Sequence, residues 1–270
     1  MDAIPLLTVA LGAVIGLILA LTGAGGGILA VPMLVFGLQL TVKESAPIGL
    51  LAVGFAALLG AVLGLRKGIV RYKAALLIAA LGLVAAPAGL WLAHRIPNAP
   101  LTLVFAAVLI YASQRMFRQA SRDLRGVVNP RIANAWPCQL NPAVGRLHWT
   151  LPCARALASI GVLAGFLSGL LGVGGGFVIV PTLSRYTNLD IKSIIATSLA
   201  VIALVSLGSV VTAASAGLVN WTVAIPFASG AVLGLLIGRL LAARIAGPRL
   251  QQAFGGVGII VALSLIYRLY

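Results

Sequence analysis

The chain has 270 residues, of which 61% are hydrophobic and 9% are charged, and its mean hydropathy is +1.13. Soluble domains carry about 25% charged residues, so this composition excludes an ordinary soluble domain and indicates an integral membrane protein. The net charge of +15 arises from 19 Lys and Arg against four Asp and Glu. Nearly all of these cations lie between apolar segments, as orientation in a membrane requires, so we expect no nucleic-acid partner.

The first apolar segment is interrupted by the stretch LTGAGGGILAVPML at residues 21–34. Glycine is a poor helix former, and a helix in lipid needs its backbone hydrogen bonds closed. We therefore predict a helical leg over 4–21, a break over 22–27 and a shorter second leg over 28–40. The preceding residues lack the basic stretch of a cleaved signal peptide, so we expect them to stay in the mature protein.

Several further apolar runs approach or exceed the roughly 17–25 residues that a spanning helix needs. One of them, 100–114, is shorter than the others. In chain order, the runs are 45–65, 74–92, 100–114, 194–216, 223–241 and 250–267.

The two halves of the sequence align without a gap over about a hundred positions at an offset of 149 residues. The stretch LLGVGGGFVIVPTL at 170–183 repeats the glycines and the proline of 21–34 at the same spacing. Low-complexity apolar sequence matches Leu and Ala by chance, but it does not match glycines, prolines and arginines in register. The matched pairs include Gly12 and Gly161, Gly68 and Gly217, Arg95 and Arg244, and Phe105 and Phe254.

The repeat divides the chain into an N-terminal repeat at 1–114, an arginine-rich linker at 115–155 and a C-terminal repeat at 156–270. In the C-terminal repeat we expect a leg over 156–171, a break over 172–176 and a second leg over 177–186.

The linker carries two cysteines, Cys138 and Cys153, with His148 between them. Structural zinc sites normally have four ligands, and only three candidates are present. Two free cytosolic thiols are therefore the favoured interpretation, and we expect no metal and no cofactor.

The distribution of basic residues predicts how the halves lie in the membrane. If each broken segment dips in and returns to its own side, 16 of the 19 Lys and Arg fall on one face, whereas parallel halves give 12 at best. Cytoplasmic loops carry the Lys and Arg excess. We therefore predict an all-α polytopic membrane protein of two inverted-topology repeats, each a glycine-broken re-entrant hairpin plus three transmembrane helices. The linker is then cytoplasmic, and both termini lie outside.

Irregular backbone at membrane depth survives only where it is buried in protein or lines a polar cavity, and broken helices between inverted repeats usually form a transporter's substrate site. Each short leg starts after its glycines, so its positive end and free N–H groups favour a small anion. We predict a substrate site made of the glycines of both breaks with nearby hydroxyls: Thr22, Gly23, Gly25, Gly26, Gly27, Ser168, Gly172, Gly174, Gly175, Gly176, Thr197 and Ser198.

Other residues at the breaks are expected to be structural. Pro32 and Pro181 lie near the first turn of each short leg, where a missing N–H costs little, so their role is shape. Glycines in membrane helices often serve close helix packing alone, which we expect for Gly54, Gly60 and Gly64.

The motif G-x-G-G-G-x-x-x-x-P-x-L, present once in each half, resembles the TauE/SafE sulfite exporter family, also called toluene sulfonate uptake permeases. The stretch IKSIIATSLAVI at 191–202 is similar to the Thr-Ser-Leu element that follows the motif in that family. The resemblance implies a secondary transporter of the bacterial inner membrane for sulfite, organosulfonates or related small anions, with export as the expected direction. It also implies that Thr197 and Ser198 join the glycines at the site.

The sequence is compatible with three functions: a transporter of a sulfur-containing or other small anion working by alternating access, an anion channel on the same scaffold, and an intramembrane enzyme. Catalysis needs acids, bases or metal ligands at depth, and the four acids lie near predicted helix ends or in the linker, so the enzyme ranks last. Apart from the anion and the lipid bilayer no partner is implied, and the oligomeric state, a homo-oligomer included, is left open.

Overall fold

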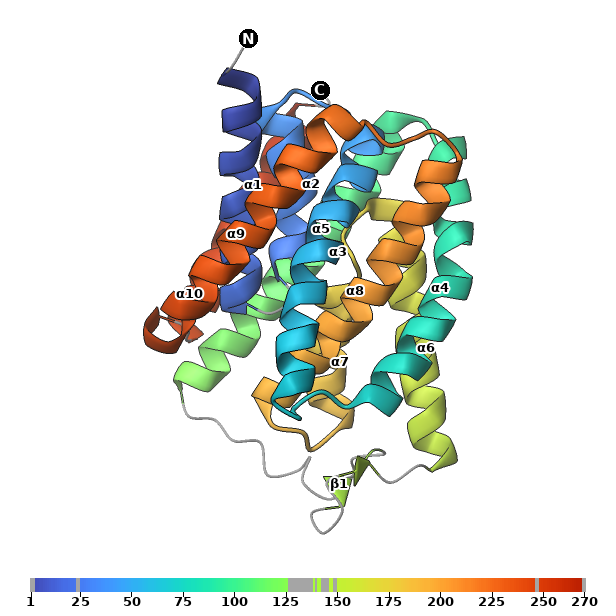
Figure 1. The fold of residues 1–270 in the computed structure, drawn as a ribbon, viewed down its shortest axis with the longest axis vertical. Coiled ribbons are helices and arrows are strands. Elements are labelled where there is room, and N and C mark those ends of the chain that lie inside the picture. The colour runs from blue at the N-terminus through green and yellow to red at the C-terminus, as the bar shows by residue number, and fades with distance from the viewer. Residues whose placement is uncertain are drawn as a thin grey trace.

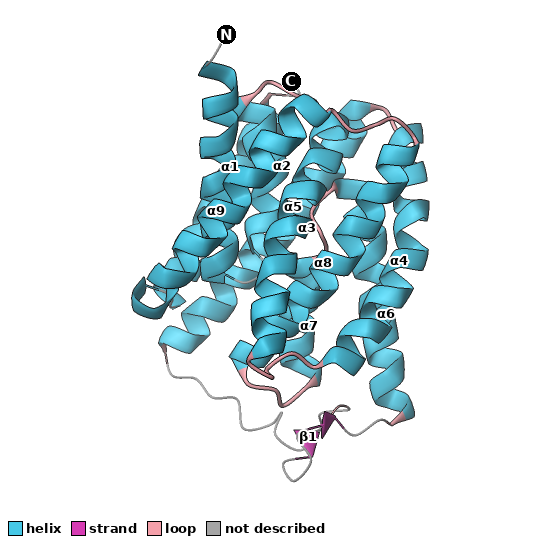
Figure 2. Cartoon of the chain, viewed as in Figure 1, coloured by secondary structure: helices cyan, strands magenta, loops and turns pink. Residues whose placement is uncertain are grey.

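The computed structural model describes residues 3–22, 25–125, 138, 140–141, 146–147, 150–245 and 248–268. These residues form ten helices and one two-stranded antiparallel hairpin (Figures 1 and 2). In chain order, the elements are α1 (Ala3–Thr22), α2 (Gly25–Gly37), α3 (Val42–Arg66), α4 (Tyr72–Arg95), α5 (Asn98–Leu124), β1 (Leu140–Asn141), β2 (Arg146–Leu147), α6 (Leu151–Leu171), α7 (Gly176–Tyr186), α8 (Ile191–Ser215), α9 (Trp221–Ile245) and α10 (Pro248–Tyr267).

Eight of the described helices are long and apolar enough to cross a membrane. The other two, α2 and α7, have 13 and 11 residues. At 1.5 Å per residue they reach about 20 Å and 17 Å, which is less than the roughly 30 Å of hydrocarbon. The all-helical membrane fold is therefore confirmed, with one short helix after a break in each half.

The start of α1 and the end of α10 lie at one end of the molecule, which we call the terminal side, and β1 lies at the opposite end, the linker side (Figure 1). The hairpin of α1 and α2 descends from the terminal side and returns to it. The hairpin of α6 and α7 rises from the linker side and returns there (Figure 1).

The packing of the helices follows the sequence repeat. Helix α1 packs on α9, and the corresponding helix α6 packs on α4. Helix α3 packs on its own counterpart α8, and α5 packs on its counterpart α10. This exchange of partners is the pattern expected of two repeats related by a pseudo-two-fold axis, although the detailed inverted geometry stays a prediction.

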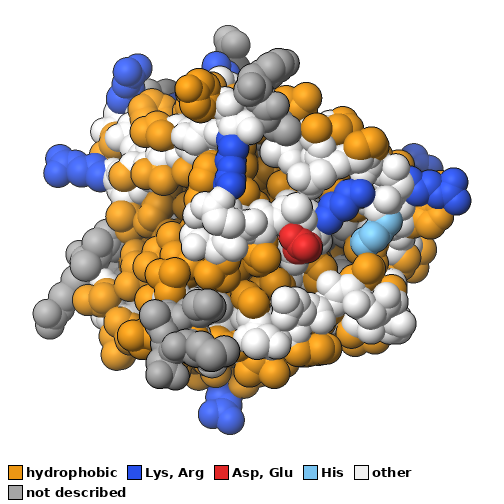
Figure 3. Space-filling view, turned by 90° about the horizontal axis from the view of Figure 1, so that it is seen from above, with side chains coloured by type: hydrophobic (Ala, Val, Ile, Leu, Met, Phe, Trp, Pro, Cys, Tyr) orange, Lys and Arg blue, Asp and Glu red, His pale blue; other side chains and the backbone are white. Residues whose placement is uncertain are grey.

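Helices α3 and α8 form the centre of the bundle. In each of them 67% of the apolar window is buried, against 22–50% in the other spanning helices. The outer helices α4, α9 and α10 instead expose large apolar side chains, such as Val84, Leu240 and Ile260. Seen from the terminal side, hydrophobic atoms cover much of the surface between scattered cations (Figure 3). The exposed apolar side chains of the outer helices suit lipid rather than water.

Glycines bring paired helices into backbone contact. A Cβ at Gly16 of α1 would clash with the Ala231 carbonyl oxygen of α9, and a Cβ at Gly165 of α6 would clash with the Gly82 backbone of α4. Gly16 and Gly165 are counterparts in the repeat. Small residues at such positions let membrane helices approach closely, so the two outer pairs are built on the same packing device.

Glycines of α3 serve the same purpose against α8. Gly54 lies against Ser206 and Leu207, and Gly60 lies against Leu199. Gly64 contacts Ala196. The prediction that these three glycines act in packing is confirmed.

Several helix ends are capped by local sequence. Thr41 and Glu44 form a reciprocal capping box at the start of α3, where the Thr41 backbone N–H donates to Glu44 Oε2 at 2.9 Å. Gly68 and Gly217, counterparts in the repeat, follow α3 and α8 with φ of +67° and +69°. This left-handed conformation, which favours glycine, ends both helices in the same way.

Some helix boundaries differ from the expectation. Helix α5 continues to Leu124, ten residues beyond the apolar run 100–114, and α6 begins at Leu151 inside the linker. Amphipathic helix ends past the apolar stretch lower its mean hydropathy, so a hydropathy run underestimates their length. The division into repeats and linker stays a prediction.

Candidate functional site

The two glycine breaks meet inside the bundle. The Val173 carbonyl oxygen in the second break lies 2.5 Å from where a Cβ of Gly27 in α2 would stand. The Gly172 carbonyl oxygen lies 3.4 Å from the corresponding position at Gly49 of α3. The 2.5 Å approach leaves no room for a side chain at position 27, so contact between the two halves requires glycine there, whereas the contact at Gly49 is an ordinary van der Waals distance.

The second break has an unusual backbone. Gly172, Gly174 and Gly175 have φ of +73°, +70° and +69°, and Gly172 to Gly176 are buried. Gly172 ends α6 and Gly175 precedes the first turn of α7. A run of left-handed residues ahead of a helix N-terminus presents backbone N–H groups to a common point, which favours an anion.

Serine hydroxyls without hydrogen-bond partners lie close to the second break. Ser45, Ser168 and Ser206 are each 0% exposed, and the Oγ atom of each has no partner among the described residues. Ser206 Oγ lies 3.0 Å from the Cβ position of Gly174. Buried hydroxyls usually have a partner, so an unpartnered group next to a break indicates that a ligand or water completes it.

A cavity of about 80 Å³ lies between the two hairpins and the paired helices α5 and α10. Thr22, Ile28 and Leu29 line it where the first hairpin turns, and α7 lines it with its first two turns. The remaining lining residues come from α5 and α10: Ala112, Ser113, Arg115, Met116, Gln119, Gln251, Phe254 and Gly258. The cavity therefore connects the start of α2 with the linker-side halves of α5 and α10.

This cavity has a counterpart at the opposite end of the molecule. The residues that correspond to Gln251, Met116 and Gln119 in the repeat are Thr102, Leu265 and Arg268, and all three line a pocket on the terminal side. That pocket contains none of the residues at the breaks. The deeper counterparts on the terminal side, Phe105 and Leu109 among them, are 2% and 1% exposed.

Arg268 joins α10 to the first hairpin on the terminal side. Its guanidinium donates to the Val35 carbonyl oxygen of α2 at 3.2 Å and to Gln39 Oε1. It also lies 5.9 Å from the ring centre of Phe36. Arg268 thus connects the end of α10 to the end of the first hairpin, whereas its counterpart Gln119 lines the cavity on the linker side.

The hydroxyls predicted for the site lie in different surroundings. Thr22 is buried beside the cavity and donates to the Ile18 carbonyl oxygen at 2.8 Å. Thr197 Oγ1 accepts the Arg71 backbone N–H at 3.0 Å, and Ser198 donates to the Ile195 carbonyl oxygen at 2.9 Å. In this conformation the α8 side chains beside the second break are Ile202 and Ser206, one to two turns further along.

The predicted glycines have separate tasks. Gly26 packs on the Leu19 backbone and Gly175 on Ala164, so they close the two hairpins, while Gly27 joins the hairpins to each other. Gly25 begins α2 and Gly176 begins α7. Gly23 lies outside the described residues. A ligand-binding role for these glycines stays a prediction.

The expected position of the prolines near the first turn is wrong. Pro32 is the eighth residue of α2 and Pro181 is the sixth of α7, because each short helix already begins at its glycines. A proline inside a helix removes a backbone hydrogen bond to the residue four positions earlier. Those residues are Ile28 and Phe177, and both line the cavity.

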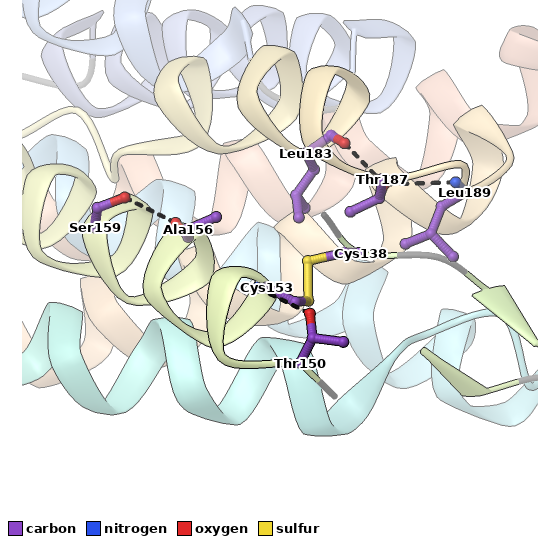
Figure 4. Close-up of a disulfide and its surroundings, with 8 residues drawn as sticks. All are labelled: Cys138, Thr150, Cys153, Ala156, Ser159, Leu183, Thr187 and Leu189. Carbon is purple, nitrogen blue, oxygen red and sulfur yellow. Dashed lines mark hydrogen bonds between the residues drawn. A yellow bond between two sulfur atoms is a disulfide. The ribbon is translucent and has the colours of Figure 1, made fainter. Parts of the chain in front are cut away.

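The interpretation of the cysteines as free thiols is also wrong. Cys138 and Cys153 form a disulfide with their Cα atoms 4.9 Å apart, and both are fully buried (Figure 4). Cys138 donates its N–H to the Tyr186 carbonyl oxygen at the end of α7. This contact places Cys138 at the end of α7, and the disulfide joins it to the first turn of α6, a proximity that spacing along the chain does not reveal. The disulfide thus holds the linker against the ends of the second hairpin.

Among the described residues, no group of three or more His, Cys, Asp or Glu side chains could hold a metal ion. The residues that sequence reasoning missed are Ser206 and the polar cavity residues Arg115, Gln119 and Gln251. One signal was available, since Arg115 and Gln119 are four residues apart and share a face if the helix continues beyond Gln114.

The relatives of this chain carry the name of probable membrane transporter proteins. It is 30% identical over 267 residues to a "Probable membrane transporter protein" of Xylella fastidiosa, with 97% of this chain and 95% of that protein covered. It is 26% identical to the probable membrane transporter protein YunE of Bacillus subtilis, and 25% identical to one from Methanocaldococcus jannaschii. Each of these two alignments covers 96% of both proteins. No solved structure matches the chain.

The spanning helices and these relatives define a multi-pass membrane protein of the transporter class. The sequence also matches the sulfite exporter TauE/SafE family over residues 8–265. The chain belongs to the sulfite exporter TauE/SafE family, as its repeated glycine motif predicted.

Proposed function

We propose that this protein is a secondary transporter, an exporter, of small sulfur-containing anions such as sulfite or organosulfonates, and that it works by alternating access. The anion is held where the two glycine breaks meet, between the hairpins. The observation that carries the proposal is the cavity, because it is lined by both hairpins, reaches the start of α2 and has one cationic side chain and no carboxylate in its wall.

The charge of the ligand follows from the surroundings of this cavity. The first N–H groups of α2 have no partner within their helix, and the dipole of that helix favours negative charge at its start. Charge-assisted hydrogen bonds to an anion contribute roughly 1.5–3 kcal/mol each. A few such bonds suffice to hold a small oxyanion.

The difference between the two ends supports alternating access. The cavity extends from the linker-side halves of α5 and α10 to Thr22 at the first break and to the first turn of α7, whereas the corresponding terminal-side pocket contains no residue at either break. In a transporter of two inverted repeats, exchanging the two arrangements would move the site from one side to the other. We assign this conformation to the state that opens toward the linker. A channel would need both ends open together.

The protein is proposed to reside in the cell inner membrane with the linker in the cytoplasm and both termini outside. The excess of Lys and Arg at the ends of the helices on the linker side supports this orientation. The linker-side cavity would then receive the anion from the cytoplasm, which agrees with export.

Thermal unfolding of the purified protein in detergent tests the proposal. The panel is the sodium salts of sulfite, sulfate, thiosulfate, sulfoacetate, acetate and chloride, with ionic strength held constant. A ligand that binds only the folded state raises the Tm, by the equivalent of about 2.7 kcal/mol at a hundredfold excess over Kd. Selective stabilisation by sulfur oxyanions is expected. An equal response to every salt would contradict an anion site, and selective stabilisation by acetate would point to a carboxylate transporter.

A further inference from the structure

Arg115 is a cation inside a predicted membrane span. Of the three arginines in the Asn98–Arg122 span of α5, Arg118 and Arg122 are exposed, whereas the side chain of Arg115 is half-buried and lines the cavity. Ionisable residues within membrane helices are costly, and they usually face a polar pathway and mark ligand or ion sites. Arg115 therefore needs an explanation beyond orientation of the chain.

The described surroundings leave the charge of Arg115 available to a ligand. Its Nη1 atom donates to the Tyr111 hydroxyl at 3.1 Å, which is a neutral partner. The lining residues of the cavity include no Asp or Glu. The same guanidinium also borders a second cavity of about 270 Å³ between α5, α6 and α7, whose lining likewise has no carboxylate.

Two amide side chains accompany Arg115. Gln119 lies one turn further along α5, and Gln251 reaches the cavity from α10. The two helices are joined beside them, since Gln252 Nε2 donates to Ser121 Oγ at 2.7 Å. Primary amides donate two hydrogen bonds each, so this end of the cavity gathers one charged and two neutral donor groups.

The rest of the cavity wall is mainly apolar. Ile28 and Leu29 lie on one hairpin, Phe177 and Val180 lie on the other, and Phe254 lies on α10. A bare inorganic oxyanion would gain nothing from such walls and would lose hydration beside them. An organic anion could place its charged head at the donors and its carbon body against the apolar walls, as in other small-molecule sites.

Comparison of the repeats supports a role specific to the linker side. The counterpart of Arg115 in the second half is Ser264, and the counterpart of Gln119 is Arg268. Arg268 donates to the Val35 carbonyl oxygen of α2 and to the side chain of Gln39 just after α2, whereas the described hydrogen-bond partner of Arg115 is the Tyr111 hydroxyl on its own helix. The two arginines thus have different tasks, one holding helices together and one facing a cavity.

We propose that Arg115, with Gln119 and Gln251, docks the charged head of the substrate at the linker-side end of the cavity, and that the preferred substrate is a small organic sulfonate rather than an inorganic oxyanion. This inference rests on the proposed function, and it adds a docking residue and a substrate class to it. The anion reaches Arg115 first and then moves toward the start of α2.

Ligand-induced thermal stabilisation of three proteins tests this inference: the wild type, Arg115→Gln and Arg118→Gln. Arg118 is the matched control, because it lies on the same helix and is exposed, and it is not among the lining residues. The probes are sodium ethanesulfonate, butyrate and sulfite at constant ionic strength. We expect ethanesulfonate to bind the wild type more tightly than sulfite. Arg115→Gln should weaken the binding of ethanesulfonate about tenfold or more, because it removes a charge-assisted hydrogen bond. Arg118→Gln should leave the Kd for ethanesulfonate within about twofold of the wild-type value.

The outcomes separate this inference from the proposed function. If no anion stabilises the wild type, the proposed function fails. If the wild type responds and Arg115→Gln responds equally, the docking role is wrong while the anion site stands. Tighter binding of sulfite or of butyrate than of ethanesulfonate would refute the substrate class.

Folding and lipid binding are controlled separately. The Tm values of the three proteins without ligand should agree, and Arg115→Lys should restore part of the affinity through its charge. A phospholipid headgroup could supply the same anionic chemistry as a free substrate. Stabilisation by phosphatidylglycerol that needs Arg115 and exceeds stabilisation by ethanesulfonate would show a lipid site and overturn the inference.

Discussion

At the scale of single residues, the buried hydroxyl of Ser206 has the sharpest consequence. Its Oγ has no partner among the described residues and faces Gly174 of the second break. Such a group destabilises the unliganded fold and becomes useful only when a ligand or water accepts or donates a hydrogen bond. The chain therefore retains this hydroxyl at a cost to its stability.

We expect Ser206→Ala to raise the free energy of unfolding of the unliganded protein by about 1 kcal/mol and to reduce stabilisation by a bound anion. Ser209→Ala is the control, because Ser209 lies one turn away on α8 and donates to the Val205 carbonyl oxygen at 2.8 Å. Thermal unfolding with and without sodium ethanesulfonate measures both effects. A destabilised Ser206→Ala protein with an unchanged ligand response would contradict this role.

Sequence alone predicts the glycines of the site better than its side chains. The paired glycine motifs predict both breaks, because a doubled pattern of glycines has few other causes in a membrane protein. Ser206 corresponds to Ala57 in the first half, so the repeat does not single it out. Arg115 falls just beyond an apolar run, and the continuation of α5 that brings it to the cavity is decided by packing against α10.

At the scale of helices, the two ends of the α5 and α10 pair differ although their sequences are related. On the terminal side, Arg268 ties α10 to the first hairpin, and Phe105 and Leu265 are buried beneath it. On the linker side, the corresponding residues Gln119, Phe254 and Met116 line the cavity. We therefore expect the contact of Arg268 with α2 to keep the terminal-side pocket from extending to the breaks in this conformation.

We expect Arg268→Gln to increase access to the terminal side, since glutamine is the residue at the corresponding open position. Cysteine in place of Leu265 reports on this side, and cysteine in place of Met116 reports on the linker side. With Cys138 and Cys153 changed to Ser, the rate of maleimide labelling measures access in detergent. Leu265→Cys should be labelled slowly in the protein that keeps Arg268. Adding Arg268→Gln should make this labelling at least about tenfold faster, because the substitution removes a charged hydrogen bond to α2. An unchanged rate of labelling at Leu265→Cys would show that Arg268 does not restrict access to the terminal side.

The helices themselves follow largely from local sequence, and their boundaries follow less well. Hydropathy predicts the spanning segments, and the caps Thr41 and Gly68 have recognisable signatures. The first break is shorter than expected because Gly25–Gly27 join α2, where contact with Leu19 and Val173 stabilises a helical conformation that glycine alone disfavours. Tertiary contact thus overrides propensity at the breaks.

At the scale of the whole molecule, charge and disulfide chemistry give opposite indications. The basic residues favour a cytoplasmic linker. Disulfides persist mainly in oxidising compartments, and the Cys138–Cys153 disulfide holds the linker to the second hairpin. Both cysteines are fully buried, which shields the disulfide from reductants, so a cytoplasmic linker remains compatible with it.

We expect labelling from outside the cell to support the orientation given by the charges. Lys67 and Ala216 are exposed residues at corresponding positions of the repeat, after α3 on the linker side and after α8 on the terminal side. In a protein with both native cysteines changed to Ser, a membrane-impermeant maleimide should label Ala216→Cys in intact cells. It should label Lys67→Cys only after the membrane is opened. The reverse pattern would place the linker outside and agree with the disulfide instead.

The central claim is that the two hairpins move a small anion across the membrane by alternating access, with the site open to only one side at a time. Counterflow in proteoliposomes tests it most directly: vesicles loaded with unlabelled ethanesulfonate are diluted into a trace of the labelled compound. The account predicts transient, saturable accumulation of label above equilibrium, which vesicles without protein lack. Uptake that never exceeds equilibrium and does not saturate, with unitary currents in planar bilayers, would contradict alternating access and identify a channel.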